Sequence, residues 1–262
     1  MLQALKESRA RGDAYLNLDC PVCHGPSTPF FEKDGYDIDR CERCQFVFVR
    51  NIPSEVTLAE FYSPYYGESE TFVPIIQRRF SKRISKTLEN WWHGKSIERR
   101  AGGRKRLLEI GCGEGHLLKA LARGNTFDVE GIDYAKGAVQ YLRDQGLNVS
   151  QSSLFDKAYP DGHFDFVVGF HVLEHVQQLD EFMSEVKRIL SARGRVYFVV
   201  PCVTHFKAVH AGRDWKHFGP PGHLWYFSVD AMRRFMANQG FHVVFAHCFS
   251  NRAHLTVLAE KH

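Results

Sequence analysis

The chain has 262 residues, of which 44% are hydrophobic and 24% charged, a composition typical of folded globular domains rather than of disordered or fibrous chains. The formal net charge of +4 is too small to indicate a nucleic-acid-binding protein by itself. No apolar run reaches the roughly eighteen residues that a membrane span needs, and residues 1–12 lack an apolar signal core. We therefore expect neither export nor membrane spanning, and a cytoplasmic location.

We expect residues 1–14 to form only a short, weak helix, and we assign them no function. Two C-x-x-C pairs follow, with seventeen residues between them. Tetrahedral Zn²⁺ favours four thiolates, and two such turns joined by a hairpin can present them. The spacing predicts a structural zinc ribbon with the ligands Cys20, Cys23, Cys41 and Cys44. His24 could replace one thiolate, although its position favours a neighbouring surface histidine.

The remaining cysteines, Cys112, Cys202 and Cys248, lie singly in apolar, strand-like or turn contexts. We expect free thiols and a reducing compartment rather than a disulfide framework. Residues 53–103 predict a helical cap, with a short helix from Thr57 and an amphipathic helix over 74–98. From residue 72 to 106 there are eleven Lys or Arg against two Glu. This basic segment is expected to be a solvated helical face, with an anionic surface as the alternative partner.

Helical and strand patterns alternate from residue 106 onwards, which indicates βαβ units and a mainly parallel sheet covered on both faces. A final helix over 229–240 and two strands joined at Ser250-Asn251 predict a terminal hairpin. The expected strands are 106–110, 127–132, 147–151, 164–170 and 195–200, then 241–248 and 253–259. The expected helices of the βαβ part are 115–123, 135–145 and 179–190.

The first of these strands runs into a glycine-rich turn, Glu109-Ile-Gly111-Cys-Gly113-Glu-Gly115. Glycines allow positive φ and let a ligand approach the main chain. The P-loop pattern is excluded because no Lys-Ser or Lys-Thr follows at its spacing, and the dinucleotide pattern fails because His116 stands where its third glycine belongs. An acidic residue before the turn suits a ligand with an ammonium group.

The second strand ends at Asp133, whose carboxylate can accept both hydroxyls of a ribose. A ligand with an ammonium group and an adenosyl group but no phosphate, such as S-adenosylmethionine, fits both Glu109 and Asp133. The chain from about residue 106 resembles the class I S-adenosylmethionine-dependent methyltransferases. The resemblance lies in four segments: the glycine motif, Gly131-Ile-Asp133, Ser152-Ser153-Leu154-Phe155-Asp156, and the segment from Phe164 to Val176 that contains Leu173-Glu174-His175. The cofactor-binding residues that we predict are Glu109, Gly111, Cys112, Gly113, Gly115, Asp133, Tyr134, Ser153, Leu154 and Phe170.

The ribbon, the tyrosine-rich segment after it and Gly222-His223-Leu-Trp-Tyr226-Phe-Ser resemble zinc-ribbon methyltransferases that act on sugars and other small metabolites. The resemblance implies an α/β fold with a Rossmann-like seven-stranded methyltransferase sheet and a C-terminal antiparallel hairpin, preceded by a zinc ribbon and a helical cap. The expected domains are 1–52 for the ribbon, 53–103 for the cap and 104–262 for the methyltransferase domain.

For a hydroxyl acceptor, the enzyme must align the reactants and remove a proton. The first candidates for these catalytic roles are His171, Glu174 and His175, which follow the fourth strand. The others lie in the long segment 202–227, where we prefer His223, then His217, then Tyr226. Loops of that length are usually functional. A histidine among these residues is the expected general base.

His171-x-x-Glu174-His175 also resembles the E-x-x-E-H metal site of certain methyltransferases, with His223 as a completing ligand. Histidine replaces the first glutamate, so a softer ion than Mg²⁺ would be expected if a catalytic metal is used.

The sequence thus predicts methyl transfer from S-adenosylmethionine to an oxygen of a small molecule, a sugar or a natural-product intermediate, with structural Zn²⁺. An RNA methyltransferase that uses the ribbon and the basic segment is one alternative. A non-catalytic module that binds the cofactor or a partner is another. The sequence does not indicate the acceptor's identity or the oligomeric state.

Overall fold

A computed structural model describes residues 16–17, 19–54, 56–58, 61, 90–101, 105–249 and 252–262. Several expectations lie outside these residues: the N-terminal helix over 1–14, most of the helical cap, the glycines at 102 and 103, and the Ser250-Asn251 turn. Within the described part, residues 56–58 and 90–98 are helical.

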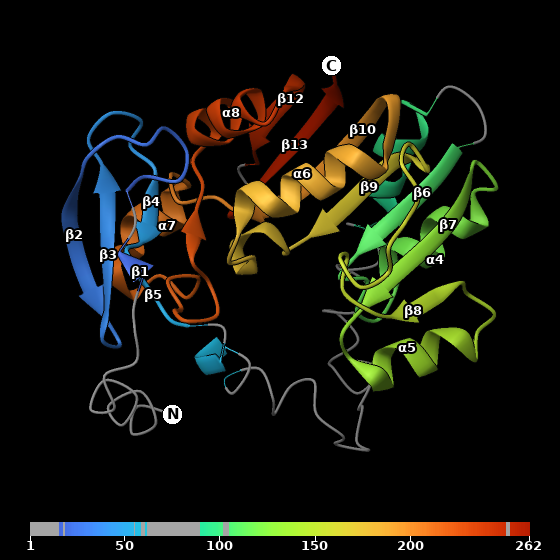
Figure 1. The fold of residues 1–262 in the computed structure, drawn as a ribbon, viewed down its shortest axis with the longest axis horizontal. Helices are drawn as coiled ribbons and strands as arrows, with labels where there is room; N and C mark the ends of the chain where they lie inside the picture. Colours follow the sequence, from blue (N-terminus) through green and yellow to red (C-terminus); the bar gives the residue numbers. More distant parts are fainter. Residues whose placement is uncertain are drawn as a thin grey trace. The chain divides into compact units, whose positions relative to one another are not determined.

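A seven-stranded sheet contains β6 (Lys105–Ile110), β7 (Phe127–Asp133), β8 (Val149–Gln151), β9 (Phe164–Phe170), β10 (Leu190–Pro201), β12 (Phe241–Cys248) and β13 (His254–Lys261). Its strand order is β12-β13-β10-β9-β6-β7-β8 (Figure 1). The pairs β6–β7, β6–β9 and β7–β8 are parallel. The neighbours β12 and β13 are joined by only five residues, 249–253, and a parallel crossover needs about a dozen or more. The expected mainly parallel sheet with a terminal hairpin is therefore present.

The central strand, β6, carries the glycine turn at its carboxyl end. Leu107 pairs with Val129 of β7 on one side and with Phe166 of β9 on the other. Leu107, Leu108 and Ile110 are all buried, as expected for a strand that is covered on both faces. The turn consequently starts from a rigid position in the middle of the sheet.

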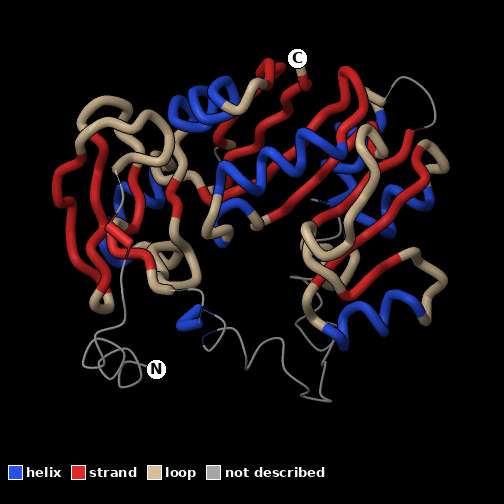
Figure 2. Tube along the Cα trace, viewed as in Figure 1, coloured by secondary structure: helices blue, strands red, loops and turns tan. Residues whose placement is uncertain are grey.

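Helices α4 (His116–Arg123), α5 (Lys136–Arg143) and α6 (Leu179–Ile189) lie within this α/β part of the chain (Figure 2). The buried face of α4 consists of Leu117, Leu118 and Leu121, a spacing that places apolar side chains on one stripe of a helix. The predicted helices 115–123, 135–145 and 179–190 are confirmed to within two residues at each end.

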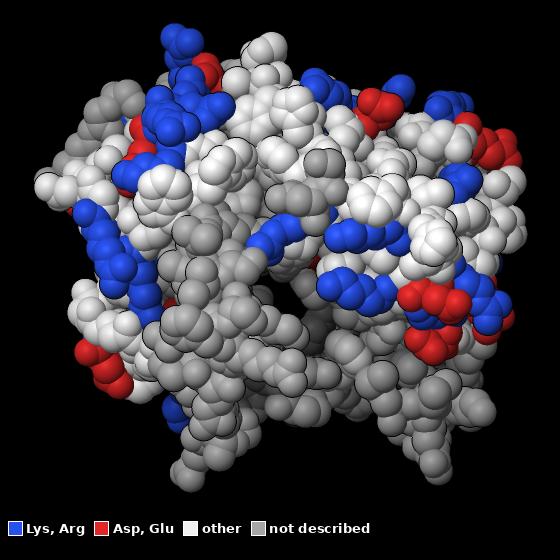
Figure 3. All heavy atoms as spheres, turned by 180° about the vertical axis from the view of Figure 1, so that it is seen from behind, with Lys and Arg blue, Asp and Glu red and all other residues white. Residues whose placement is uncertain are grey.

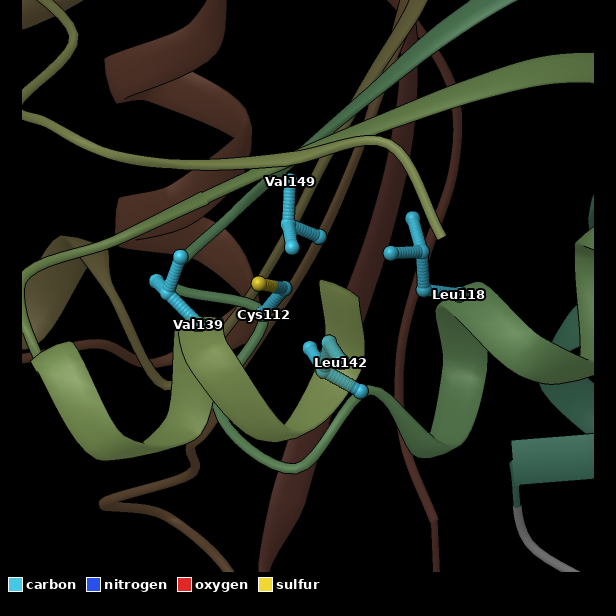
Figure 4. Close-up of a cluster of buried hydrophobic side chains, with 5 residues drawn as sticks. All are labelled: Cys112, Leu118, Val139, Leu142 and Val149. Atoms are coloured by element: carbon cyan, nitrogen blue, oxygen red, sulfur yellow. The ribbon is translucent and has the colours of Figure 1, made fainter. Parts of the chain in front are cut away.

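The glycine turn, α4, α5 and β8 share an apolar cluster (Figure 4). It consists of Cys112, Leu118, Val139, Leu142 and Val149, all buried. The packing is close, because a Cβ on the nearby Gly131 would come 2.9 Å from Val149 and 3.0 Å from the Cys112 sulfur. The turn is thus supported from below by a filled core.

Strand β10 begins at Leu190, directly after α6, whereas the sequence indicated a strand over 195–200 only. The segment Ser191-Ala-Arg193-Gly194 has the composition of a turn, and Arg193 does have a left-handed φ of 63°. Arg195 nevertheless bonds Glu260 of β13 at 2.8 Å and 2.9 Å, and Arg193 bonds the same carboxylate at 3.1 Å. These bonds tie the early part of β10 to the sheet, a contact that local composition does not reveal.

A second, four-stranded sheet has the order β11-β4-β3-β2. Its strands are β2 (Ser27–Lys33), β3 (Tyr36–Cys41), β4 (Val47–Val49) and β11 (Trp225–Tyr226), and β1 (Leu16–Asn17) pairs separately with β5 (Asn51–Ile52). Trp225 stands opposite Phe48, so the ribbon receives a strand from late in the chain. The short helices α7 (Phe206–Ala211), η3 (Gly212–Asp214) and η2 (Leu173–His175), and then α8 (Val229–Asn238), complete the described elements.

The chain forms two compact units. One comprises Met1–Ser63, His171–Met183 and Phe198–Ala259; the other comprises Pro64–Phe170, Ser184–Tyr197 and Glu260–His262. Within the first unit, the ribbon shares its sheet with β11. Among the described residues, no helix is both long and apolar enough to span a bilayer.

Candidate cofactor, metal and acceptor sites

The glycine turn has the backbone conformation that its composition predicts. Gly111, Gly113 and Gly115 have φ values of 66°, 50° and 66°, a region that favours glycine. The three positions differ in the space around them. A Cβ at Gly115 would come 2.5 Å from Leu142, whereas a Cβ at Gly113 would meet nothing within 4 Å. Gly115 is therefore needed for packing, and Gly113 faces open space that a ligand can enter.

Glu109 supplies a buried acid at the base of this turn. Its side chain is only 3% exposed, and its Oε2 atom has no hydrogen-bond partner. Burial raises its pKa to about 8, and the charge of Asp133 contributes in the same direction. An unpartnered buried carboxylate oxygen fits a ligand that brings a cationic donor, such as the ammonium group of S-adenosylmethionine.

Asp133 ends β7 and binds two backbone N–H groups. Its Oδ2 accepts from Gly113 at 2.7 Å and its Oδ1 from Ala135 at 2.8 Å. Asp133 therefore holds the glycine turn beside β7, a role that the sequence reasoning did not include. Each carboxylate oxygen retains a second lone pair, so the predicted contact with a ribose diol is compatible with these bonds.

The other predicted cofactor residues belong to the same compact unit. Cys112 packs in the apolar cluster of Figure 4, where burial raises the pKa of its thiol. Tyr134 is 55% exposed, directly after Asp133, and burial of its hydroxyl end raises its pKa. Ser153 donates to Asp156 at 2.6 Å, Leu154 is buried, and Phe170 is the last residue of β9. Tyr134, Ser153 and Leu154 follow the ends of β7 and β8, while Cys112 serves packing.

The four ribbon cysteines come together as one group. Cys20 Sγ lies 3.5 Å from Cys44 Sγ, and Cys23 Sγ lies 3.4 Å from Cys41 Sγ. A tetrahedral zinc site with metal–sulfur distances of about 2.3 Å separates its sulfurs by roughly 3.8 Å, so small adjustments suffice for binding. All four donor atoms lie within 4.8 Å of one another, and His24 does not belong to the group. The donor set fits Zn²⁺.

The predicted acceptor residues also gather, around a buried glutamate. Glu174 is fully buried, and its Oε1 lies 2.9 Å from His171 Nδ1. His175 and His223 have ring centroids 4.6 Å apart, and the centroid of His217 lies 5.7 Å from that of His223. One donor atom from each of Glu174, His175 and His223 lies within 4.8 Å of the others.

Two of these histidines have strongly lowered pKa values. Burial lowers the pKa of His217 to about 3 and that of His223 to about 4, and neighbouring basic groups add to the shift. Both rings are consequently neutral at physiological pH. His171 has a positive φ of 57°, an unusual backbone state for a residue other than glycine.

The long segment around Tyr226 has regular secondary structure. The segment 202–227 contains α7, η3 and β11. Tyr226 is fully buried, and its hydroxyl donates to the carbonyl of His223 at 2.8 Å. Its geometry therefore suits holding His223 in place more than contacting an acceptor.

His254, at the start of β13, was missed by the sequence reasoning. Its ring centroid lies 4.7 Å from that of His171 and 6.2 Å from that of His217. Nothing in the local sequence marks this residue, because it approaches the cluster only through the order of the strands in the sheet.

One expectation about the cysteines is wrong. Cys202 and Cys248 form a disulfide, with Cα atoms 6.3 Å apart, although they are 46 residues apart in the sequence. Cys202 follows β10 and Cys248 ends β12, and these strands flank β13 in the sheet. The singly spaced cysteines therefore do not support a reducing compartment. Cys20, Cys23, Cys41, Cys44 and Cys112 are free thiols.

Curated relatives match part of the chain. A protein of Mycobacterium tuberculosis named as a probable S-adenosylmethionine-dependent methyltransferase is 32% identical over 124 residues, which is 44% of either chain. A ubiquinone biosynthesis O-methyltransferase of Methylococcus capsulatus is 33% identical over 103 residues, covering 37% of this chain and 43% of its own. The chain thus spans less than half the length of these relatives.

Solved structures show the same fold at low identity. A SAM-dependent methyltransferase from Archaeoglobus fulgidus aligns with a TM-score of 0.54 and 17% identity, over 70% of this chain and 100% of its own. The 4+2 cyclase SpnF aligns with a TM-score of 0.54 and 17% identity, over 65% of this chain and 81% of its own. One fold thus carries different activities, and these alignments establish architecture only.

A family model described as a methyltransferase domain matches residues 76–245, which is more than half of the chain. The matched range contains the glycine turn, Asp133 and the segment from Phe170 to His175. On this match, the chain belongs to the methyltransferase domain family.

Proposed function

We propose that this protein transfers a methyl group from S-adenosylmethionine to an oxygen atom of a small molecule, a sugar or a natural-product intermediate. The observation that carries the proposal is the buried, unpartnered Oε2 of Glu109 below a glycine turn that Asp133 holds in place. The bound cofactor would supply an electrophilic methyl group on its sulfonium. The name of the Methylococcus relative specifies O-methylation, which supports an oxygen acceptor.

In the proposed complex, Glu109 pairs with the ammonium group of the cofactor and Asp133 accepts the ribose hydroxyls. Gly113 leaves room for the ligand against the main chain. Tyr134, Ser153 and Leu154 flank the adenine. These assignments use the carboxylate lone pairs of Glu109 and Asp133 that the protein's own hydrogen bonds leave unused, and the open space beside Gly113.

The acceptor's proton is taken by a histidine that follows β9 or lies in segment 202–227. His175 and His223 suit this role, because each ring donates its Nδ1–H to a backbone carbonyl and presents Nε2 as a proton acceptor. Burial lowers the pKa of His217 to about 3 and that of His223 to about 4, so both are weaker bases than an ordinary histidine. His171 is already engaged with Glu174.

The four ribbon cysteines bind structural Zn²⁺ in this proposal. With four thiolates the site is closed, so the ion contributes to folding and not to the reaction. A cytoplasmic location is part of the proposal because the four ribbon cysteines are free thiols, whereas the Cys202–Cys248 disulfide argues for an oxidising compartment.

The two alternatives have weaker support. Most of the basic segment 72–106 lies outside the described residues. Among the described residues on the face seen in Figure 3, Lys and Arg occur in separate groups, with Asp and Glu beside some of them. A non-catalytic module fits the family match less well, since the named relatives are enzymes.

The test has two stages. Calorimetry should first show that the zinc-replete protein binds S-adenosylhomocysteine and that Glu109→Gln weakens this binding. Incubation with methyl-labelled cofactor and fractionated small-molecule extract should then yield a labelled product that is stable as an ether. Absence of cofactor binding would refute the proposal, and binding without turnover on any fraction would favour a non-catalytic module. Label in RNA would favour the RNA alternative.

A further inference from the structure

Helix α7 carries its large apolar side chains on the exposed face. Phe206 is 61% exposed and Val209 is 69% exposed, whereas Ala208 is the buried residue of the helix. Residues three and four positions apart share one face of a helix, so Phe206, Val209 and His210 lie together. A surface helix ordinarily turns its apolar stripe towards the core. Helix α7 has the opposite arrangement.

Basic side chains accompany this apolar pair. Between residues 204 and 216 there are three Lys or Arg and one Asp, and all four side chains are exposed. Lys207 Nζ lies 5.8 Å from the ring centroid of Phe206. Arg213 is 76% exposed and lies 4.0 Å from Asp214, which is 87% exposed, and an ion pair of this kind contributes little. With histidine counted as neutral, the segment has a local charge of +2.

The segment 204–216 is anchored to the rest of its compact unit. The Nδ1 atom of His205 accepts the backbone N–H of Lys207 at 3.1 Å and so caps α7. Lys33 of β2 donates to the carbonyl oxygen of Arg213 at 2.9 Å, and Trp215 is buried. These contacts do not involve the side chains of Phe206 and Val209. The exposed pair therefore stands on a support that substitutions at its outer face leave in place.

We propose that the outer face of segment 206–216, formed by Phe206, Val209, Arg213 and Lys216, binds the surface of an anionic lipid bilayer. Attachment to a bilayer surface uses apolar side chains that enter the boundary between headgroups and acyl chains, and Lys or Arg that attract acidic headgroups. Phe206 and Val209 supply the apolar part. Arg213 and Lys216 supply the positive charge that complements the lipid. This mode of binding needs no spanning helix.

The size and the chemistry of this face favour a bilayer over a protein or a nucleic acid. A standard protein interface takes roughly 20–30 residues from each partner, and two apolar side chains on a six-residue helix are few for its centre. Single-stranded nucleic acid binds by stacking on aromatic rings, a role that is open to Phe206 but not to the aliphatic Val209. A bilayer accepts both side chains. Surface binding does not depend on methyl transfer, so this inference and the proposed function can fail separately.

Flotation of the full-length, zinc-replete protein with lipid vesicles tests the inference. The wild type should float with phosphatidylcholine vesicles that contain about one-third phosphatidylserine, and not with phosphatidylcholine alone. Salt at about 1 M should weaken this binding, because it shortens the screening length to about 3 Å. Phe206→Ala/Val209→Ala should weaken it by roughly tenfold or more, and Arg213→Gln/Lys216→Gln by a similar factor.

Matched controls come from the same compact unit. Val244→Ala removes a half-exposed apolar side chain from β12, and Arg234→Gln removes an exposed charge from α8. Both should float like the wild type. All variants should keep the wild-type melting temperature, since the substituted side chains are exposed. In Phe206→Trp, tryptophan emission should shift to shorter wavelength on addition of the anionic vesicles, by more than the emission of the wild type does.

Four results would overturn the inference. They are a wild type that does not float with anionic vesicles, flotation that Phe206→Ala/Val209→Ala leaves unchanged, a wild-type dimer in place of flotation that this double variant makes monomeric, and binding of single-stranded RNA in place of flotation that Phe206→Ala abolishes. The third result would assign the face to a second copy of the chain, and the fourth to nucleic acid. Binding of S-adenosylhomocysteine, measured on the same samples, reports on the proposed function independently.

Discussion

The backbone N–H of Gly113 donates to Oδ2 of Asp133 over 2.7 Å, joining the turn after β6 to the end of β7. The same carboxylate bonds the N–H of Ala135 at the entrance to α5. One side chain thus fixes the glycine turn and the start of the next helix, and it still offers lone pairs to a ligand.

Replacing Asp133 with alanine should weaken binding of S-adenosylhomocysteine by roughly 10- to 100-fold, the effect of losing charged hydrogen bonds worth about 1.5–3 kcal/mol. Asp133→Asn should weaken it less, because the amide oxygen can still accept one of the two backbone bonds. Calorimetry on both variants measures the difference. Equal affinity in Asp133→Ala and the wild type would contradict the assigned role.

The raised pKa of Glu109 predicts a pH-dependent affinity for the cofactor. The group has a pKa of about 8 in the folded protein against an ordinary value of 4.5. Pairing with an ammonium group needs the carboxylate, so binding below pH 8 should release a proton and tighten as the pH rises towards 8. Calorimetry in two buffers of different ionisation enthalpy should show this release in the wild type and not in Glu109→Gln.

The raised pKa of Glu109 also predicts the direction in which the stability of the cofactor-free protein changes with pH. Because the folded pKa is raised, folding favours the protonated form, and this contribution is fully present below pH 4.5 and is lost as the pH rises through 8. Glu109→Gln, which cannot ionise, should therefore gain stability relative to the wild type between pH 6 and 9 in the cofactor-free protein, by a few kcal/mol at about pH 9. Denaturant unfolding across this range checks it, and a constant difference between the two proteins would contradict it.

Alanine at Gly115 and at Gly113 should have different effects, although both positions have positive φ. Gly115→Ala adds a clash with Leu142 at 2.5 Å to the backbone strain, so we expect a loss of roughly 2–4 kcal/mol in unfolding free energy. Gly113→Ala meets open space and should lose only about 1 kcal/mol, from strain. Its main effect should be weaker cofactor binding. Denaturant titration and calorimetry on both variants separate the two roles.

Removal of the ribbon metal should destabilise the unit that contains β2, β3, β4 and β11. Chelation of zinc, or Cys41→Ser, should lower its melting temperature by roughly 10 °C or more, because a small metal site contributes directly to folding. Glu42→Gln, an exposed neighbour between the same two cysteines, is the control and should leave the melting temperature unchanged. Unchanged melting after full zinc loss would argue against a structural metal.

The parallel sheet and the cofactor turn could be predicted from the sequence because their signals are local. The glycines, Glu109 and Asp133 lie within 25 residues, and each acts through the backbone segment to which it belongs. The apolar stripe of α4 likewise needs only helical spacing. Local chemistry and the final geometry agree in this region.

Features that depend on distant parts of the chain escaped the same reasoning. His254 joins His171, and Cys248 joins Cys202, only because β12, β13 and β10 lie side by side in the sheet. The early start of β10 depends on Glu260 of β13. Periodicity and composition do not contain these pairings, since they arise when the strands assemble.

The pairing of Trp225 with Phe48 has a consequence for biosynthesis. A ribosome releases the ribbon about 175 residues before β11, so the edge of β4 has no partner strand while the rest of the chain is made. An open edge can pair with other nascent chains. Fragments that end before residue 225 should consequently aggregate more readily than the full chain, even when zinc is supplied.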